Sequence, residues 1–196
     1  MGSKGSSNIE LVVGLGNPGS QYEDTRHNAG FWFVDLLAQR FGGSFKPESR
    51  FHGVACRIRV AGSECWLLKP STFMNRSGQS VSSLARYYKI PVENILVAHD
   101  ELDLPAGELR LKKGGGHAGH NGLRDIMSAM DGGFYRLRVG IDHPGDRNRV
   151  SDYVLSRPSR ADHESICVGL ERAADSIPLI LLGEFQKAMN TLHSKS

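Results

Sequence analysis

Strand-like apolar runs alternate with stretches of helical spacing along nearly the whole chain, and this alternation limits the possible folds more than any other feature. Residues 9–15 are rich in β-branched residues and leucine and end in glycines, as a buried strand does. Residues 26–41 then show helical spacing that stops at Gly42-Gly43. Such interleaving favours an α/β fold, a single-domain three-layer sandwich with a central mixed, mostly parallel twisted sheet and helices on both faces.

The remaining elements are predicted by the same rules. Residues 53–61 and 64–69 alternate like the arms of a hairpin with its turn at Gly62-Ser63. Further strands are predicted at residues 95–99, 108–112 and 136–141, and helices at 77–89, 123–130 and 161–192, the last interrupted at Pro178. Functional loops are expected beyond the carboxyl ends of the strands.

Length and composition are typical of one globular domain. The chain has 196 residues, 39% hydrophobic and 23% charged, which excludes collagen-like and disordered classes. We expect one domain over residues 9–196, preceded by a flexible tail or expression remnant at 1–8, which lacks the apolar core of a signal peptide. The apolar run at 177–182 contains Pro178 and is far shorter than the roughly 20 residues that cross a bilayer. No membrane association is therefore predicted.

The three cysteines, Cys56, Cys65 and Cys167, form no CxxC pair and are odd in number. A turn at Gly62-Ser63 would not place Cys56 opposite Cys65. We therefore expect free buried thiols and a reducing compartment, the cytoplasm. Because the cysteines lie within predicted strands or a helix, a thiol nucleophile is not expected.

The net charge of +3 is unevenly distributed. Residues 40–90 carry nine basic and two acidic side chains, residues 91–103 carry four acidic ones, and residues 104–150 carry eight basic and five acidic ones. This pattern suggests a surface that faces a polyanion, although a mixed solvated surface would give the same sums.

Gly14-Leu-Gly-Asn-Pro-Gly19 satisfies the GxGxxG fingerprint of dinucleotide-binding folds, but its context does not. The helical pattern begins only near Arg26, and the acidic residue about 20 positions on, Asp35, lies in mid-helix. A structural turn, or a loop that presents the Asn17 amide, fits better.

Polar residues suited to acid–base chemistry fall in the predicted loops at strand ends. His27 and Asp100 offer an imidazole and the carboxylate that would orient it as a general base. Asparagine amides suit an oxyanion, and they occur at Asn17, Asn28, Asn75 and, beside His120, at Asn121. No GxSxG motif is present, and Ser77 is interpreted as a helix cap. Water is therefore the expected nucleophile.

A metal site is the alternative, because His99, Asp100, Glu101, His117 and His120 are ligand types close together in the sequence. The two histidines of His117-Ala-Gly-His120 are three residues apart in a glycine-rich loop rather than on one helix face. No HExxH motif is present. We therefore predict neither a metal nor another cofactor.

The loop at residues 114–122 is flanked by basic side chains that could cradle phosphate groups with exposed backbone amides. A solvated basic face is the alternative. The basic set is Lys112, Lys113, Arg124, Arg136 and Arg138, of which Lys112 and Arg138 are predicted to contact phosphate.

Six motifs in order resemble the bacterial peptidyl-tRNA hydrolase family. They are GLGNPG at 14–19, TRHNAG at 25–30, KPSTFMN at 69–75, HDELDLP at 99–105, GGGHAGHNGL at 114–123 and RLRVGIDHPG at 136–145. The resemblance covers residues 9 to about 192. It implies an enzyme, an ester hydrolase that releases a nascent peptide from the 3′-terminal ribose of tRNA in translation.

The resemblance also implies roles for particular residues. His27 matches the base that activates water, and Asp100 matches its supporting carboxylate. Asn17, Asn75 and Asn121 match amides that position the substrate, and Tyr22 and Met74 match residues that line the same cleft. His120 lies in the part of the sequence that matches the family's gate loop, between the active site and a cationic clamp for phosphate. Lys112 and Arg138 match the cationic clamp on the 5′ phosphate of tRNA.

Two other function classes stay open at this point. Organellar relatives of this fold bind RNA in splicing without catalysis, but they would need a transit peptide, and none is visible. A nicotinamide-dependent oxidoreductase would need the fingerprint that the context disfavours. We expect a monomeric cytoplasmic hydrolase whose partner is peptidyl-tRNA.

Overall fold

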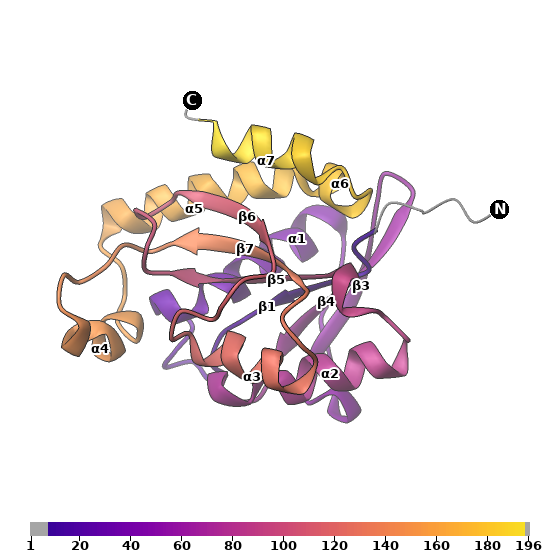
Figure 1. The fold of residues 1–196 in the computed structure, drawn as a ribbon, viewed down its shortest axis with the longest axis horizontal. Helices are drawn as coiled ribbons and strands as arrows, with labels where there is room; N and C mark the ends of the chain where they lie inside the picture. The colour runs from indigo at the N-terminus through magenta and orange to yellow at the C-terminus, as the bar shows by residue number, and fades with distance from the viewer. Residues whose placement is uncertain (1–7, 195–196) are drawn as a thin grey trace.

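The structure of the chain is a computed structural model that describes residues 8–194. Within this range seven strands form one sheet in the order β2-β3-β4-β1-β5-β7-β6 (Figure 1). Strands β1, β2, β4, β5 and β7 run in one direction, and β3 and β6 run in the other. The strands are β1 Leu11–Gly14, β2 Lys46–Glu48, β3 Gly53–Val60, β4 Ser63–Pro70, β5 Ile95–Glu101, β6 Leu109–Lys113 and β7 Tyr135–Gly140.

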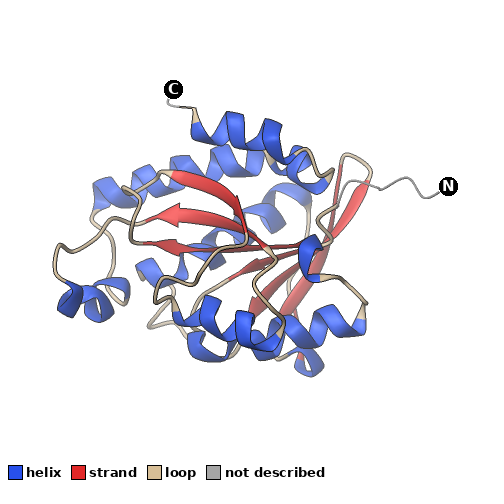
Figure 2. Cartoon of the chain, viewed as in Figure 1, coloured by secondary structure: helices blue, strands red, loops and turns tan. Residues whose placement is uncertain are grey.

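Helices cover both faces of this sheet, which confirms the predicted three-layer α/β sandwich (Figure 2). Helices α2 Ser77–Tyr87 and α3 Asn121–Ala129 cover one face, and α1 Ala29–Phe41, α5 Arg160–Asp175, α6 Ile177–Leu181 and α7 Phe185–His193 cover the other. The short helix α4 Val150–Val154 stands off the end of the sheet toward which β5 and β7 point (Figure 1). Short 3₁₀ turns are η1 Arg26–Asn28, η2 Ser49–Phe51, η3 Met74–Arg76, η4 Val92–Asn94 and η5 Arg147–Arg149.

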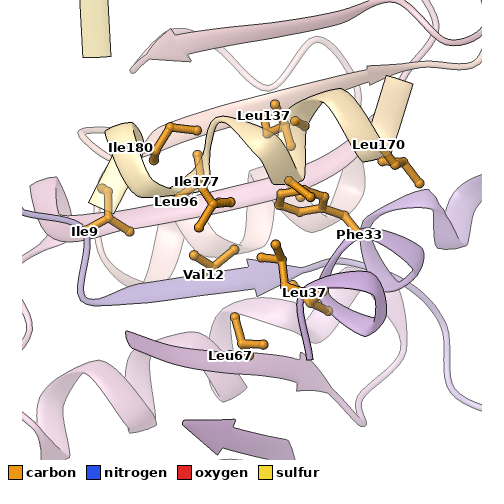
Figure 3. Close-up of a cluster of buried hydrophobic side chains, with 14 of the residues drawn as sticks. Ile9, Val12, Phe33, Leu37, Leu67, Leu96, Leu137, Leu170, Ile177 and Ile180 are labelled. Carbon is orange, nitrogen blue, oxygen red and sulfur yellow. The ribbon is translucent and has the colours of Figure 1, made fainter. Parts of the chain in front are cut away.

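The central strands are buried on both faces, as their continuous apolar runs predict. Val12 and Leu96 point toward α1 and α6, where they meet Phe33 and Ile177 (Figure 3). Their neighbours in sequence point to the other face and pack against α2 and α3. Within residues 8–194, none of the helices combines the length and apolar character that crossing a bilayer would require.

Two glycines bring the start of α1 into direct contact with the sheet. A Cβ on Gly14 would lie 2.2 Å from the Gly30 carbonyl oxygen, and one on Gly30 would lie 2.3 Å from the carbonyl oxygen of Ala98. Neither site has room for a side chain, so the helix start lies backbone to backbone on β1 and β5. The glycine motif therefore serves packing, and α1 begins at Ala29 with Asp35 exposed in mid-helix, as its context predicted.

Several local predictions were wrong or incomplete. Ser77 is not a helix cap: it is the first residue of α2, and its hydroxyl donates to the Met74 carbonyl at 2.7 Å. The hairpin turn consists of Ala61-Gly62, because Val60 pairs with Ser63. The C-terminal helical stretch breaks at Ser176, just before Pro178, rather than at the proline.

Two elements were missed, and one thiol was misplaced. Strand β2 is an edge strand containing Pro47, and α4 has only five residues. Cys56 and Cys65 are free and buried as predicted, but the free Cys167 is exposed on α5. Burial raises the pKa of the Cys56 thiol to about 11, so it is no candidate nucleophile. Of the predicted tail at 1–8, only Asn8 lies within the described residues.

Candidate active site

Loops from distant parts of the chain meet beyond the carboxyl ends of β1, β4 and β5 and enclose a cavity of about 680 Å³. Seven of the predicted site residues line it, namely Asn17, His27, Met74, Asn75, Asp100, His120 and Asn121. The predicted cleft residue Tyr22 and the predicted clamp residues Lys112 and Arg138 are not among the lining residues. Most of the predicted site residues therefore meet at one cavity, and the two residues predicted to bind phosphate do not line it.

At the floor of the cavity one carboxylate joins two histidines. Asp100, near the end of β5, is only 4% exposed. His27 on η1 donates from Nδ1 to Asp100 at 2.9 Å, and His120 donates from Nε2 to the same carboxylate at 2.8 Å. His120 directly precedes α3. The Asp100 carboxylate thus joins two histidines that are 73 and 20 residues away from it in the sequence.

The hydrogen bonds fix which ring nitrogens carry protons. Nδ1 of His120 accepts from the backbone N–H groups of Gly122 and Leu123 and caps the start of α3, so its proton lies on Nε2. Nδ1 of His27 faces the carboxylate and therefore carries a proton. This leaves Nε2 of His27 as an unprotonated acceptor in the neutral ring, on a side chain that lines the cavity. Such a nitrogen can take a proton from water.

Electrostatics at this site favour a charged pair. Burial lowers the pKa of His27, but the charge of Asp100 and the hydrogen bond to it outweigh burial and raise that pKa above its ordinary value. Burial alone would raise the pKa of Asp100, yet His27 and His120 hold it well below its usual range. Asp100 is therefore ionised at neutral pH and stabilises the imidazolium that forms when His27 accepts a proton.

Hydrogen bonds fix both the backbone and the side chain of Asn17. Its backbone N–H donates to Asn28 Oδ1 at 2.8 Å, and Asn28 Nδ2 donates back to the Asn17 carbonyl at 2.9 Å. Its side-chain Oδ1 accepts from the Met74 N–H at 2.8 Å. The bond to Oδ1 leaves Nδ2 of Asn17 available to donate, on a side chain that lines the cavity. Asn28 was counted among the amides suited to an oxyanion, but it is 1% exposed and does not line the cavity, so its side chain positions Asn17 instead.

His27, Asp100 and His120 could also be considered as metal ligands, because their ligating atoms lie within 4.8 Å of one another. The sequence had suggested a different set. In this set both histidines direct a proton-bearing nitrogen at the carboxylate, and the other nitrogen of His120 accepts backbone hydrogen bonds. A cation would have to displace those protons, so the donor arrangement fits proton transfer better than metal binding.

Burial and the neighbouring His120 lower the pKa of His99 to about 4, so His99 is neutral.

The predicted phosphate-binding side chains lie on the α3 side of the sheet. Lys112 on β6 is exposed, and Arg138 on β7 donates to Glu101 at 2.8 Å, so part of its charge is already balanced. Arg136 was expected to help cradle phosphate, but it is 2% exposed and its guanidinium donates to the carbonyls of Gly115 and Gly116. It holds the glycine-rich loop instead.

Comparison with known proteins agrees with this geometry. A family model described as peptidyl-tRNA hydrolase matches residues 11–196. The chain belongs to the peptidyl-tRNA hydrolase family. A peptidyl-tRNA hydrolase of Neisseria meningitidis serogroup C (strain 053442) is 53% identical over 191 residues, covering 97% of this chain and 100% of that relative. One from Coxiella burnetii (strain CbuG_Q212) is also 53% identical, over 190 residues, covering 96% of this chain and 100% of that relative.

The fold agrees equally well with solved members of the peptidyl-tRNA hydrolase family. The crystal structure of peptidyl-tRNA hydrolase from Acinetobacter baumannii has a TM-score of 0.95 and 48% sequence identity to this chain, and the match covers 100% of this chain and 99% of that one. The sequence resemblance to this enzyme family is thus confirmed, as is the predicted fold.

Proposed function

We propose that this chain hydrolyses the ester bond between a peptide and the 3′-terminal ribose of tRNA, and that water activated by His27 is the nucleophile. Membership of the family supports the substrate class. The observation that carries the mechanism is the His27–Asp100 pair, which engages Nδ1 and leaves Nε2 available on a side chain that lines a cavity of about 680 Å³.

The reaction follows from the positions of these groups. Nε2 of His27 removes a proton from water, and the water oxygen forms a bond to the ester carbonyl carbon. The tetrahedral oxyanion accepts a hydrogen bond from Nδ2 of Asn17. When the bond to the ribose oxygen breaks, that oxygen takes the proton from His27. The products are a free peptide carboxyl group and a tRNA with its ribose hydroxyl restored.

The other residues of the cavity are assigned to binding. Asn75 and Asn121 are exposed side chains on its lining, and we assign their amides to the peptide end of the substrate. Met74 is buried beneath the cavity between Asn17 and Gly122 and shapes its floor. Tyr22 does not line the cavity in this structure, and we assign it a contact with the substrate that forms on binding.

Lys112 and Arg138 are assigned to a tRNA phosphate. Both lie on the face of the sheet that carries α3, and α3 begins at the active site. A nucleic acid strand can therefore run along this face from the active site to the two basic side chains. Of the nine basic residues between 40 and 90, Arg40, Arg57, Arg59 and Lys69 form ion pairs within the protein. That segment therefore offers tRNA fewer free charges than its sum of +7 implied.

We further propose that residues 9–196 form one domain that acts as a monomer in the cytoplasm, where translation produces its substrate. Light scattering at working concentration tests the oligomeric state, and the expected result is the mass of one 21.5 kDa chain. A stable dimer would contradict it.

The decisive test of function uses one tRNA charged in two ways. An N-acetylated aminoacyl-tRNA mimics the peptide linkage, and the same tRNA with a free amine is the control. We expect release of the acetylated acyl group at least tenfold faster than release of the free amino acid. Cleavage of neither substrate, with tRNA still bound, would support an RNA-binding role instead.

A further inference from the structure

Arg26, the residue before His27, has a buried guanidinium in an unusual environment. The residue is 8% exposed. Its polar partners are the carbonyl oxygens of Tyr153 and Ser156, at 3.1 and 3.3 Å, and the hydroxyl of Ser156. The guanidinium also lies 3.8 Å from the centre of the Tyr153 ring. Since these partners are neutral, the contacts are not those of an ordinary ion pair.

All of these partners belong to α4 or the residues just after it. Helix α4 spans only five residues, Val150–Val154, and a helix so short is not stable by itself. Carbonyl groups at a helix C-terminus lack partners within the helix, and a cation placed there satisfies them. Arg26 does this from outside the helix, and its backbone N–H also donates to Ser156 at 3.0 Å.

The other side of α4 faces the active-site cavity. Val150, Val154 and Leu155 line that cavity together with the exposed ring of Phe73. These apolar side chains contrast with the cationic Lys112 and Arg138, which we assign to tRNA. The apolar part of the cavity suits the side chains of the peptide.

We propose that Arg26 is a positioning residue that holds α4 as the apolar wall of the cavity, so that peptide residues beyond the ester-linked one bind against it. The inference rests on the proposed function, because it assigns the peptide to the α4 side. Arg26 acts through α4 and does not touch the reacting atoms.

The experiment compares N-acetyl-aminoacyl-tRNA with a tRNA that carries an N-acetylated tetrapeptide ending in the same amino acid. In Arg26→Ala, we expect KM for the tetrapeptidyl substrate to rise about tenfold, since contacts remote from the bond that breaks are lost. For the short substrate, kcat should stay within about twofold of the wild-type value. The acid limb of the pH profile should not move, because the contact between His27 and Asp100 remains. Arg26→Lys should rescue only partly, since an ammonium lacks the planar face that lies against the Tyr153 ring.

Arg160→Ala is the matched control, because Arg160 is exposed at the start of α5 and should leave both substrates unaffected. If Arg26→Ala does not fold, the combined change Tyr153→Leu with Ser156→Ala removes the ring and hydroxyl contacts of Arg26 while the two carbonyl contacts remain, and it should give a smaller rise in KM for the tetrapeptidyl substrate alone. An equal loss of kcat on both substrates, or an unchanged ratio of their KM values, would overturn the proposal. Wild-type protein that releases neither acyl group would instead refute the proposed function.

Discussion

Replacing Asp100 by asparagine is the perturbation that the active-site geometry predicts most fully. The carboxylate accepts from Nδ1 of His27 and from Nε2 of His120 at the same time. An asparagine side chain offers one oxygen and one NH₂ group, so one of the two histidines would face a donor with its own N–H. If that histidine is His27, its proton moves to Nε2, and the nitrogen needed for proton abstraction is blocked.

The size of the effect follows from what the substitution removes. One of the two hydrogen bonds to the carboxylate is lost, and a hydrogen bond to a charged group contributes roughly 1.5–3 kcal/mol. Blocking the general base removes its usual contribution of about 10²- to 10⁴-fold in kcat, which corresponds to about 2.7–5.5 kcal/mol. The loss of the base therefore sets the size of the effect. We therefore expect kcat of Asp100→Asn to fall by about 10²- to 10⁴-fold with KM changed much less.

The pH profile gives an independent readout. In the wild-type protein His27 must be neutral to act as a base, and its pKa is raised by Asp100, so activity falls as the pH drops through that raised value. Without the carboxylate only burial acts on the imidazole, and burial lowers its pKa. The acid limb of kcat/KM should therefore move to lower pH in Asp100→Asn.

The assay is the release of an N-acetylated amino acid from tRNA between pH 5 and 9. Asp35→Asn is the matched control, because Asp35 is exposed in the middle of α1 and should alter neither kcat nor the acid limb. A loss of less than tenfold in Asp100→Asn, or an acid limb that stays in place, would refute the reasoning.

Three further predictions concern metal binding, the packing of the start of α1 and the proposed phosphate clamp. Dialysis against a chelator should leave kcat within about twofold, and a loss that added Zn²⁺ restores would contradict the proton assignments of His27 and His120. Gly30→Ala should lower the free energy of unfolding by about 1–3 kcal/mol, because its Cβ would meet backbone atoms at 2.3 and 2.5 Å. Gly116→Ala, which has open space, is the control, and equal denaturation midpoints would count against close packing. Lys112→Ala should raise KM and reduce the salt slope of tRNA binding by about 0.7–0.9, with kcat nearly unchanged. An unaltered slope would remove Lys112 from the clamp.

Much of the fold could be predicted because its signals are local. The central strands are continuous apolar runs, and buried residues alternate with exposed ones in the second half of β3, just before the glycine turn of the β3–β4 hairpin. What was missed is short or depends on neighbours. Strand β2 has three residues and includes Pro47, and α4 is too short to display a helical period. Their conformations depend on contacts with β3 and Arg26 rather than on their own sequences.

The site was predictable in its residue types and less so in its connections. The sequence motifs pointed to His27 and Asp100 and to several asparagines. Both residues line one cavity, together with Asn17, Asn75 and Asn121. The sequence did not show that His120 bonds directly to Asp100, because that contact depends on how the glycine-rich loop folds back to the strand end. Arg136 was counted in the basic set around the glycine-rich loop for its charge alone, whereas its burial at the loop carbonyls depends on tertiary structure.

The most direct test of the account is single-turnover cleavage of N-acetyl-aminoacyl-tRNA by His27→Ala, measured beside the affinity of the same variant for tRNA. If Nε2 of His27 is the base, the rate should fall by about 10²- to 10⁴-fold while the dissociation constant for tRNA changes less than about threefold. Cleavage at a rate near that of the wild-type protein would contradict the central claim that His27 activates the attacking water.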